Sequence, residues 1–527
     1  MPLTTQSLKK ILGVVSSRSS ITGRRLLSSR APLEVRHARV SPVATIAGGA
    51  AAVTGAAAYL LQSPTFPKDH EDAASLVPQI SPLKRNRDAD GGSPSIEQLK
   101  SPVRALSVAE ANDLLRREER SKIFDAGNGQ RGRCDLVRVA SNCPVEDEFV
   151  TGTQAGPGGK PWTFWGVFDG HAGWATSVLL REALVPMVSD HLEHLPTDAT
   201  SPVISTGIVQ AFLAVDDAIN RSALATMNDP EAQPGSAQVV SAIAPAISGS
   251  CALLAAYDPR TTTLRVACTG DSRAVLGRAL PNPDGAKPRE KYEAVPLSRD
   301  QTGKNDDEYA RLTAAHPGEE KTMINRESGR LLGLAVTRAF GDHRWKWREG
   351  DITEAQQKYW SSAPRPNSKS PPYLTAEPVV EETPIKVGTR AAAGGAADGE
   401  ARRGDFLILA SDGLWDHISN EDAVECVARW IDAKKAKALR GTPSGLLKHK
   451  PPRRNEHWWL DEGRYVEWRA TPEYFVVEDD NAAAHLVRNA FGGSRRNLFC
   501  GVMSAYPPIS RNVRDDTTVQ VVFFGDV

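Results

Sequence analysis

Acidic residues stand at the ends of three separate apolar runs in this chain. Asp169 and Asp412 each follow such a run, and Asp515 precedes one; the runs are 162–168, 406–410 and 518–524. Short apolar runs rich in Val, Ile and Phe are typical of buried strands, which hold a carboxylate rigidly at their ends. Carboxylate oxygens without cysteine or clustered histidine suit Mg²⁺ or Mn²⁺ better than Zn²⁺. We therefore predict that the three aspartates converge on hard divalent cations.

The alternative for any one of these aspartates is an ordinary turn. Asp-Gly is a common turn dipeptide, and it occurs at both Asp169-Gly170 and Asp412-Gly413. His171 stands beside the first pair, and Trp415-Asp416 follows the second. The three acidic motifs taken together favour a metal site over three unrelated turns.

These motifs resemble those of the metal-dependent serine/threonine protein phosphatases of type 2C. The resemblance covers roughly residues 120–527, in the family's order, and further matching segments are 144–147, 248–251, 269–274 and 334–342. It implies an α+β fold: a four-layer sandwich of two central antiparallel β-sheets with helices on both outer faces. Strands and helices that come in blocks rather than in strict alternation also favour antiparallel sheets over a doubly wound fold.

The resemblance also implies a set of metal ligands. Two ions, Mg²⁺ or Mn²⁺, would be bridged by Asp169, and the backbone carbonyl of Gly170 would bind one of them. Asp412 and Asp515 would complete one metal site, and Glu146 would hold the other, partly through water. Two metals can activate a bridging water for in-line attack on a phosphate ester.

The residues around these ligands receive supporting roles from the same resemblance. Asp147 and Asp416 would lie next to the ligands without binding a metal directly. Asp271 would help to bind a third metal unless it is only a turn residue. His171 is the candidate general acid, because imidazole titrates near neutral pH; alone, it would more often cap the following helix.

One position departs from the family pattern. Many members carry an arginine that grips the substrate phosphate four residues before the glutamate, where this chain has Asn142. An amide cannot supply a charged fork. Arg138 and Arg338 are the candidates for replacing it.

Other segments narrow the resemblance to catalytic subunits of pyruvate dehydrogenase phosphatases; they are 141–147, 305–317, 330–334, 339–347 and 371–378. This implies a mitochondrial phosphatase acting on the phosphorylated E1 alpha subunit of pyruvate dehydrogenase. One alternative is the same chemistry on another mitochondrial phosphoprotein. The other is an inactive scaffold that only binds phosphoproteins, which should have lost ligands that this chain retains.

The N-terminal region predicts targeting rather than folded structure. Residues 1–39 are rich in Arg, Lys and Ser, with no acid before Glu34, which is typical of a mitochondrial transit peptide, although a basic tail is the alternative. The uncharged stretch 40–62 fits either an inner-membrane anchor or a flexible linker, and 63–100 is a tether. The catalytic domain would then lie in the matrix, free or anchored, or face the intermembrane space.

The remainder, 101–527, predicts one catalytic domain with insertions near 281–292, 386–403 and 433–470. Ser107 and Glu110 form a capping box that opens a helix, further helices are expected over 175–188 and 209–227, and a hairpin over 251–267. The 64 basic and 64 acidic side chains give a formal net charge of +0, so nothing points to nucleic acid. Six scattered cysteines argue against a zinc site or a disulfide scaffold.

Overall fold

The computed structural model describes residues 105–281, 291–389, 403–440, 460–461 and 466–525. The predicted transit peptide (1–39), the candidate membrane segment (40–62) and the tether (63–100) lie outside these residues. So do the central parts of the three predicted insertions, 282–290, 390–402 and 441–459.

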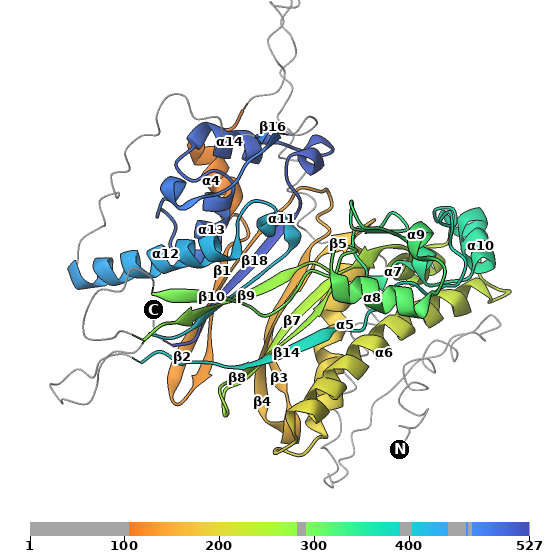
Figure 1. Cartoon of the computed structure of the whole chain (residues 1–527), viewed down its shortest axis with the longest axis horizontal. Coiled ribbons are helices and arrows are strands. Elements are labelled where there is room, and N and C mark those ends of the chain that lie inside the picture. The colour runs from red at the N-terminus through yellow and green to blue at the C-terminus, as the bar shows by residue number, and fades with distance from the viewer. Residues whose placement is uncertain (1–104, 282–290, 390–402, 441–459, 462–465, 526–527) are drawn as a thin grey trace, which may run out of the picture. The chain divides into compact units, whose positions relative to one another are not determined.

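Two antiparallel β-sheets form the centre of the described domain (Figure 1). The larger has the strand order β1-β2-β18-β15-β9-β10, and the smaller has β14-β8-β7-β4-β3. In the larger sheet the strands are β1 Arg120–Gly127, β2 Gln130–Val139, β18 Thr517–Phe523, β15 Phe406–Ala410, β9 Arg273–Ala279 and β10 Tyr292–Pro296. In the smaller they are β14 Val379–Pro384, β8 Thr263–Thr269, β7 Ala252–Asp258, β4 Pro161–Phe168 and β3 Glu148–Ala155.

The two sheets pack face to face through alternate residues of their strands. On β15, Leu407 and Leu409 join a buried cluster that also holds Trp165 of β4 and Leu253 of β7. The intervening residues of β15 point the other way, into a separate cluster under the helices. Because both faces of β15 are buried, its sequence is a continuous apolar run rather than an alternating one.

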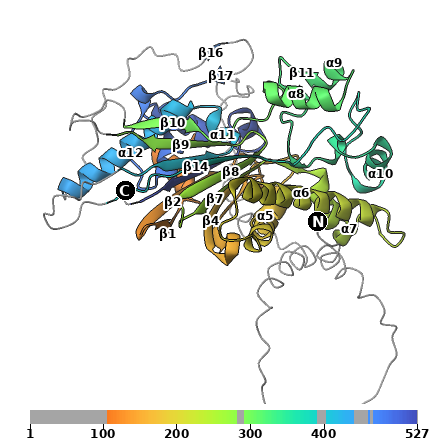
Figure 2. The ribbon, with the colours of Figure 1, turned by 60° about the horizontal axis from the view of Figure 1, so that its bottom comes forward.

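Helices cover the outer face of each sheet (Figure 2). Those packed on the smaller sheet are α5 Ala175–Glu193, α6 Ser201–Met227, α7 Ala237–Ile247 and α10 Glu349–Tyr359. Those packed on the larger are α4 Val108–Arg116, α12 Asn420–Arg440, α13 Ala482–Ala490 and α14 Arg496–Ser504. The predicted α+β four-layer sandwich is therefore confirmed.

The predicted helices are present, but some of them begin or end at other residues than predicted. Ser107 and Glu110 form the predicted capping box at the start of α4. The predicted helix over 209–227 begins eight residues earlier, at Ser201, where Pro202 occupies the first turn. Helix α12 runs to Arg440, so the start of the predicted insertion at 433–470 is helical.

Among the residues the structure describes, α6 is the one helix long and apolar enough to cross a bilayer by length and composition. Its buried residues include Ile208, Phe212 and Val215, which pack in the core cluster between the helices and the smaller sheet. Core packing therefore accounts for its apolar composition.

The strand ends that carry the predicted ligands meet at one end of the sandwich. Ala410 of β15 pairs with Val519 of β18, so the end of one strand lies beside the start of the other. Beyond β15 lies the one-turn helix α11 Asp412–Trp415. Beyond β4 lies a small sheet, order β13-β6-β5, with bounds Phe340–Gly341, Gly249–Ser250 and Gly170–His171.

Candidate metal centre and active site

Three aspartates from distant parts of the chain form a compact acidic cluster. Asp169 follows β4, Asp271 lies in the turn between β8 and β9, and Asp412 begins α11. One carboxylate oxygen from each lies within 4.8 Å of the others. Asp169 and Asp412 thus come together as the strand-end prediction requires, and Asp271 joins them more closely than a simple turn residue would.

The cluster carries unbalanced negative charge. Oδ2 of Asp169 and Oδ1 of Asp412 are buried, and neither has a hydrogen-bond partner among the described residues. Burial, and then the neighbouring carboxylates, raise the pKa of both Asp169 and Asp412 well above the usual range. Burial likewise raises the pKa of Asp271.

A divalent cation fits this arrangement. Buried carboxylates with unfilled acceptor oxygens are costly unless a cation compensates them. The donor set is all oxygen, since the cysteine nearest to it, Cys251, donates its Sγ–H to Asp271 at 3.3 Å and is not a thiolate ligand. Oxygen donors match Mg²⁺ or Mn²⁺.

The other two predicted ligands, Asp515 and Glu146, are not members of this cluster among the described residues, and each has other partners. Asp515 forms an ion pair with Arg511 and accepts the backbone N–H of Asp516 at 2.7 Å. Glu146 accepts Gly173 N–H at 2.7 Å on one oxygen and Asn142 Nδ2 at 3.1 Å on the other. Their role as metal ligands therefore stays a prediction.

Gly170 permits the close approach that brings Glu146 to this site. A Cβ at Gly170 would lie 2.3 Å from the carbonyl oxygen of Glu146, so any side chain here would push the two segments apart. Ser177 holds the same carbonyl with a hydrogen bond of 2.5 Å.

Asp147 and Asp416 occupy different surroundings. Asp147 is buried and accepts Ser411 Oγ at 2.8 Å, just before Asp412. Burial, then the charge of Asp516, raises the pKa of Asp147 to about 7. Asp416 is exposed at the end of α11, where its charge adds to the burial and carboxylate effects that raise the pKa of Asp412. Both aspartates lie near Asp412, a predicted ligand, and the charge of each raises the pKa of Asp412.

His171 is held by a partner that the sequence analysis did not assign. Its Nε2 lies 2.6 Å from Oδ2 of Asp342, across the small three-stranded sheet. Desolvation lowers the pKa of His171, but the Asp342 carboxylate outweighs it, and the net pKa is raised. A Cβ at Gly249 would lie 2.2 Å from His171 Nε2, so glycine leaves room for this pair. The side chain is therefore oriented by a carboxylate and does not cap α5.

Asp516 is a second residue that the sequence analysis left without a role. It is buried, and one oxygen accepts the backbone N–H groups of Ser141 and Asn142. The other accepts the N–H of Glu146 at 2.8 Å and Asn142 Nδ2 at 3.0 Å. It thereby fixes the loop that carries Glu146 to the start of β18.

The structure gives all three phosphate-binding candidates other partners. Asn142 Nδ2 is shared between Glu146 and Asp516. Arg138 donates to Glu118 at 3.0 Å and to the Asp147 carbonyl at 2.9 Å, and its side chain is 5% exposed. The side chains of Asn142 and Arg138 are therefore both bound to other groups of the protein.

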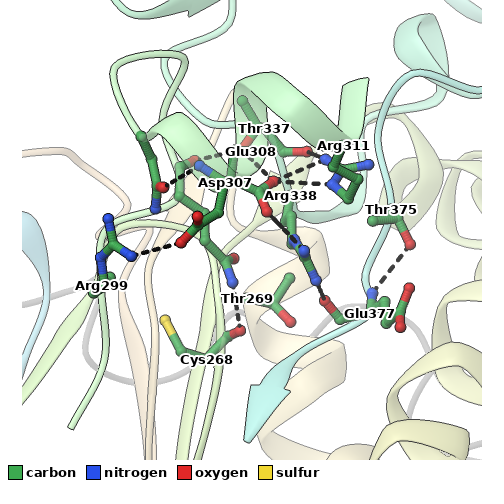
Figure 3. A network of polar contacts seen from close by, with 12 residues as sticks. Cys268, Thr269, Arg299, Asp307, Glu308, Arg311, Thr337, Arg338, Thr375 and Glu377 are labelled. Carbon is green, nitrogen blue, oxygen red and sulfur yellow. Dashed lines mark hydrogen bonds and ion pairs between the residues drawn. The ribbon is translucent and has the colours of Figure 1, made fainter. Parts of the chain in front are cut away.

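Arg338, the third candidate, belongs to the buried network drawn in Figure 3. Its Nε and Nη2 both donate to Oε1 of Glu308, at 2.9 and 2.6 Å, and its Nη1 donates to the Glu377 carbonyl. Arg311 and Thr337 donate to the other oxygen of Glu308. Arg338 is thus a structural side chain tying α8 (Asp306–Ala315) to the segment after β12 (Arg330–Leu331).

We expect Glu308→Gln to lower the free energy of unfolding by about 3 kcal/mol at pH 7. Burial would raise the pKa of Glu308, but the hydrogen bonds from Arg338 and Arg311 outweigh it and lower the pKa to about 2. Because the folded-state pKa is depressed, this stabilisation is complete above the unfolded pKa of roughly 4.3 and is lost as pH falls towards 2. Urea unfolding at several pH values measures it.

The gap between wild type and Glu308→Gln should therefore narrow below about pH 4. The control is Glu354→Gln, which breaks an i,i+4 pair with the 53% exposed Lys358 and should change the free energy of unfolding far less than Glu308→Gln does. A gap that stays constant down to pH 3 would show that the ion pairs are not its source.

Comparison with known proteins shows which family this chain is similar to. Residues 142–444 match the family described as protein phosphatase 2C. A protein phosphatase 2C homologue of Schizosaccharomyces pombe is 40% identical over 402 residues, which cover 75% of this chain and 80% of that protein.

Two further relatives have names that include a substrate. The mitochondrial pyruvate dehydrogenase phosphatase 1 of Saccharomyces cerevisiae is 34% identical, covering 80% of this chain and 74% of that protein. The human protein of the same name is 27% identical, covering 80% and 83%. A solved serine-threonine phosphatase 2C from Toxoplasma gondii aligns with a TM-score of 0.36 and 18% identity over 77% of this chain and 95% of that one. The chain belongs to the protein phosphatase 2C family, a family of metal-dependent enzymes, and is a protein serine/threonine phosphatase.

Proposed function

We propose that this phosphatase acts in mitochondria on phosphoserine of the pyruvate dehydrogenase E1 alpha subunit, using two bound divalent cations. The observations that carry the chemistry are the cluster of Asp169, Asp271 and Asp412, two of whose buried oxygens have no hydrogen-bond partner in the described part of the chain, and the His171–Asp342 pair. The names of the two pyruvate dehydrogenase phosphatases support the substrate. The acid-free, Arg- and Ser-rich start of the chain supports the location.

Each residue of the site has a different role in the proposed reaction. Asp169, Asp412, Asp515 and Glu146 would hold the cations, and Asp271 would take part in the same cluster. Divalent cations held by these residues would supply a more acidic water as the nucleophile and would neutralise charge on the phosphoryl oxygens. His171 would hold a proton on its imidazole and give it to the departing serine oxygen. Asp342 would keep the ring oriented and favour its protonated form.

A substrate comparison tests the proposal. The purified full-length chain, with Mg²⁺ or Mn²⁺, is given phosphorylated E1 alpha or an unrelated phosphoserine protein at equal concentration. We expect kcat/KM for E1 alpha to be at least about tenfold higher, equivalent to about 1.4 kcal/mol of transition-state binding, and release to stop with chelator. Equal rates on both proteins would reject the substrate and keep the chemistry, whereas release that survives chelation would reject the metal mechanism.

The location requires a separate measurement. Determining the mature N-terminus in isolated mitochondria tests for a cleaved transit peptide within residues 1–39. Protease digestion of intact mitochondria and of mitochondria with ruptured outer membranes then separates a matrix enzyme from one facing the intermembrane space. Carbonate extraction tests whether 40–62 anchors the chain. A chain that keeps its first residues and stays outside mitochondria would contradict the proposal.

A further inference from the structure

The substrate phosphate still needs a cationic partner from the protein. Position 142 offers an amide, Arg138 is 5% exposed, and Arg338 is 10% exposed; both arginines are bound to carboxylates. A phosphate group on a protein surface is bound most strongly by a guanidinium fork. If the chain hydrolyses phosphoserine as proposed above, one of its other arginines must supply that fork.

The segment 510–516 is bound tightly against the loop that holds position 142. Ser510 Oγ donates to the carbonyl of Ser141, and Ser141 Oγ donates to the carbonyl of Arg514 at 2.7 Å. The backbone N–H of Asn142 donates to Asp516 at 2.8 Å. A side chain from this segment can therefore reach the space that an arginine at position 142 would serve.

Arg511 is the arginine of this segment that contacts a predicted metal ligand. It lies in the short helix η6 Ile509–Asn512, and its guanidinium pairs with Asp515. By contrast Arg514, three residues further on, is buried with its Nε and Nη1 unpartnered among the described residues.

Arg511 is also accessible. Its side chain is 44% exposed, several times more than Arg138 or Arg338, and Asp515 is 23% exposed. An ion pair in contact with solvent contributes little net stability, so exchanging Asp515 for a phosphate costs little. A cation that bound Asp515 would also free the guanidinium.

We propose that Arg511 binds the substrate phosphate and replaces the arginine that is absent at position 142. The guanidinium comes from a different segment but serves the same side of the acidic cluster. Its role is to hold the phosphoserine group in place for attack, and not to exchange protons, so its loss should affect substrate binding more than the chemical step.

The test is the kinetics of Arg511→Ala in the full-length enzyme on a phosphoserine peptide. We expect KM to rise about 10- to 100-fold, with a smaller change in kcat, because a charged hydrogen-bonded contact is lost. Adding Asn142→Arg to this variant should restore much of the KM. The matched control is Arg221→Ala, which also removes an exposed arginine from an i,i+4 pair, with Asp217 on α6.

A binding measurement complements the kinetics. Fluorescence anisotropy with the labelled phosphopeptide compares Asp169→Asn with Asp169→Asn/Arg511→Ala, neither of which turns over substrate. The double variant should bind about 10- to 100-fold more weakly. A purely structural role for Arg511 would lower the melting temperature and leave this affinity unchanged.

Arg511→Lys covers the case in which the alanine variant does not fold. Lysine keeps the charge opposite Asp515 but lacks the fork, so KM should still rise several-fold. Unchanged KM and affinity in the Arg511 variants of an active enzyme would overturn this assignment alone. A wild-type enzyme without metal-dependent phosphate release would instead overturn the proposed reaction.

Discussion

Replacing Asp169 by asparagine is expected to lower phosphatase activity by about a thousandfold or more. Metal binding contributes several kcal/mol to such a reaction, and about 1.4 kcal/mol corresponds to a factor of ten. The substitution removes one charge from the cluster of Asp169, Asp271 and Asp412 while keeping the side chain's size. Steady-state release of phosphate from a phosphoserine peptide measures the loss.

The same substitution should raise, not lower, the thermal stability of the metal-free protein. Burial and neighbouring carboxylates raise the pKa of Asp169, so placing this carboxyl group at its buried position costs the folded protein stability at neutral pH. Removing the group removes the cost. The increase in melting temperature that Mg²⁺ or Mn²⁺ gives the wild type should be largely lost, as differential scanning fluorimetry with and without chelator would show.

A matched control is Asp258→Asn. Asp258 is buried at the end of β7, where it accepts hydrogen bonds from the backbone N–H of Arg260 and from Thr261 Oγ1 at 2.9 Å each. The Asp258→Asn variant should be less stable than the wild type but keep its phosphatase activity and its stabilisation by metal. If Asp169→Asn kept its metal-induced stabilisation, the cluster would not be the metal site.

The sequence could predict that Asp169 and Asp412 come together, because both follow recognisable strands. Asp169 and Asp412 stand directly after the apolar runs that became β4 and β15, and a strand end fixes the position of the next side chain. Asp271 was harder to assign, since the Gly270-Asp271 dipeptide is equally compatible with an isolated turn. β8 pairs with β7 in one sheet and β9 pairs with β15 in the other, and only these pairings bring the turn between β8 and β9 within reach of Asp169 and Asp412.

The partners of these residues were not predictable, because they depend on contacts between distant segments. His171 and Asp342 are 171 residues apart, and nothing in the spacing joins them. Asp516 lies beside a predicted ligand, but its four hydrogen bonds go to a loop more than 360 residues earlier. Arg338 was a candidate for binding phosphate from the sequence, whereas Glu308 holds it in the interior.

The second large effect is expected from His171→Ala, and it should depend on the leaving group. A general acid contributes typically 10²–10⁴-fold, so kcat on a phosphoserine peptide should fall by at least about a hundredfold. p-Nitrophenolate leaves without protonation, so kcat for p-nitrophenyl phosphate should fall much less. A role in metal binding alone would reduce both substrates equally, and the ratio of the two losses therefore tests proton donation.

Asp342→Asn should reproduce this pattern at smaller size. In the wild type the Asp342 carboxylate lies 2.6 Å from His171 Nε2. The amide of the variant has the same shape but lacks the charge that favours the imidazolium form of His171. We expect about a tenfold loss on the phosphoserine peptide and almost none on p-nitrophenyl phosphate. In the double variant His171→Ala/Asp342→Asn, the second substitution should cost little more, because Asp342 acts through the ring that is already gone. Additive losses would mean that Asp342 acts on the reaction independently of His171.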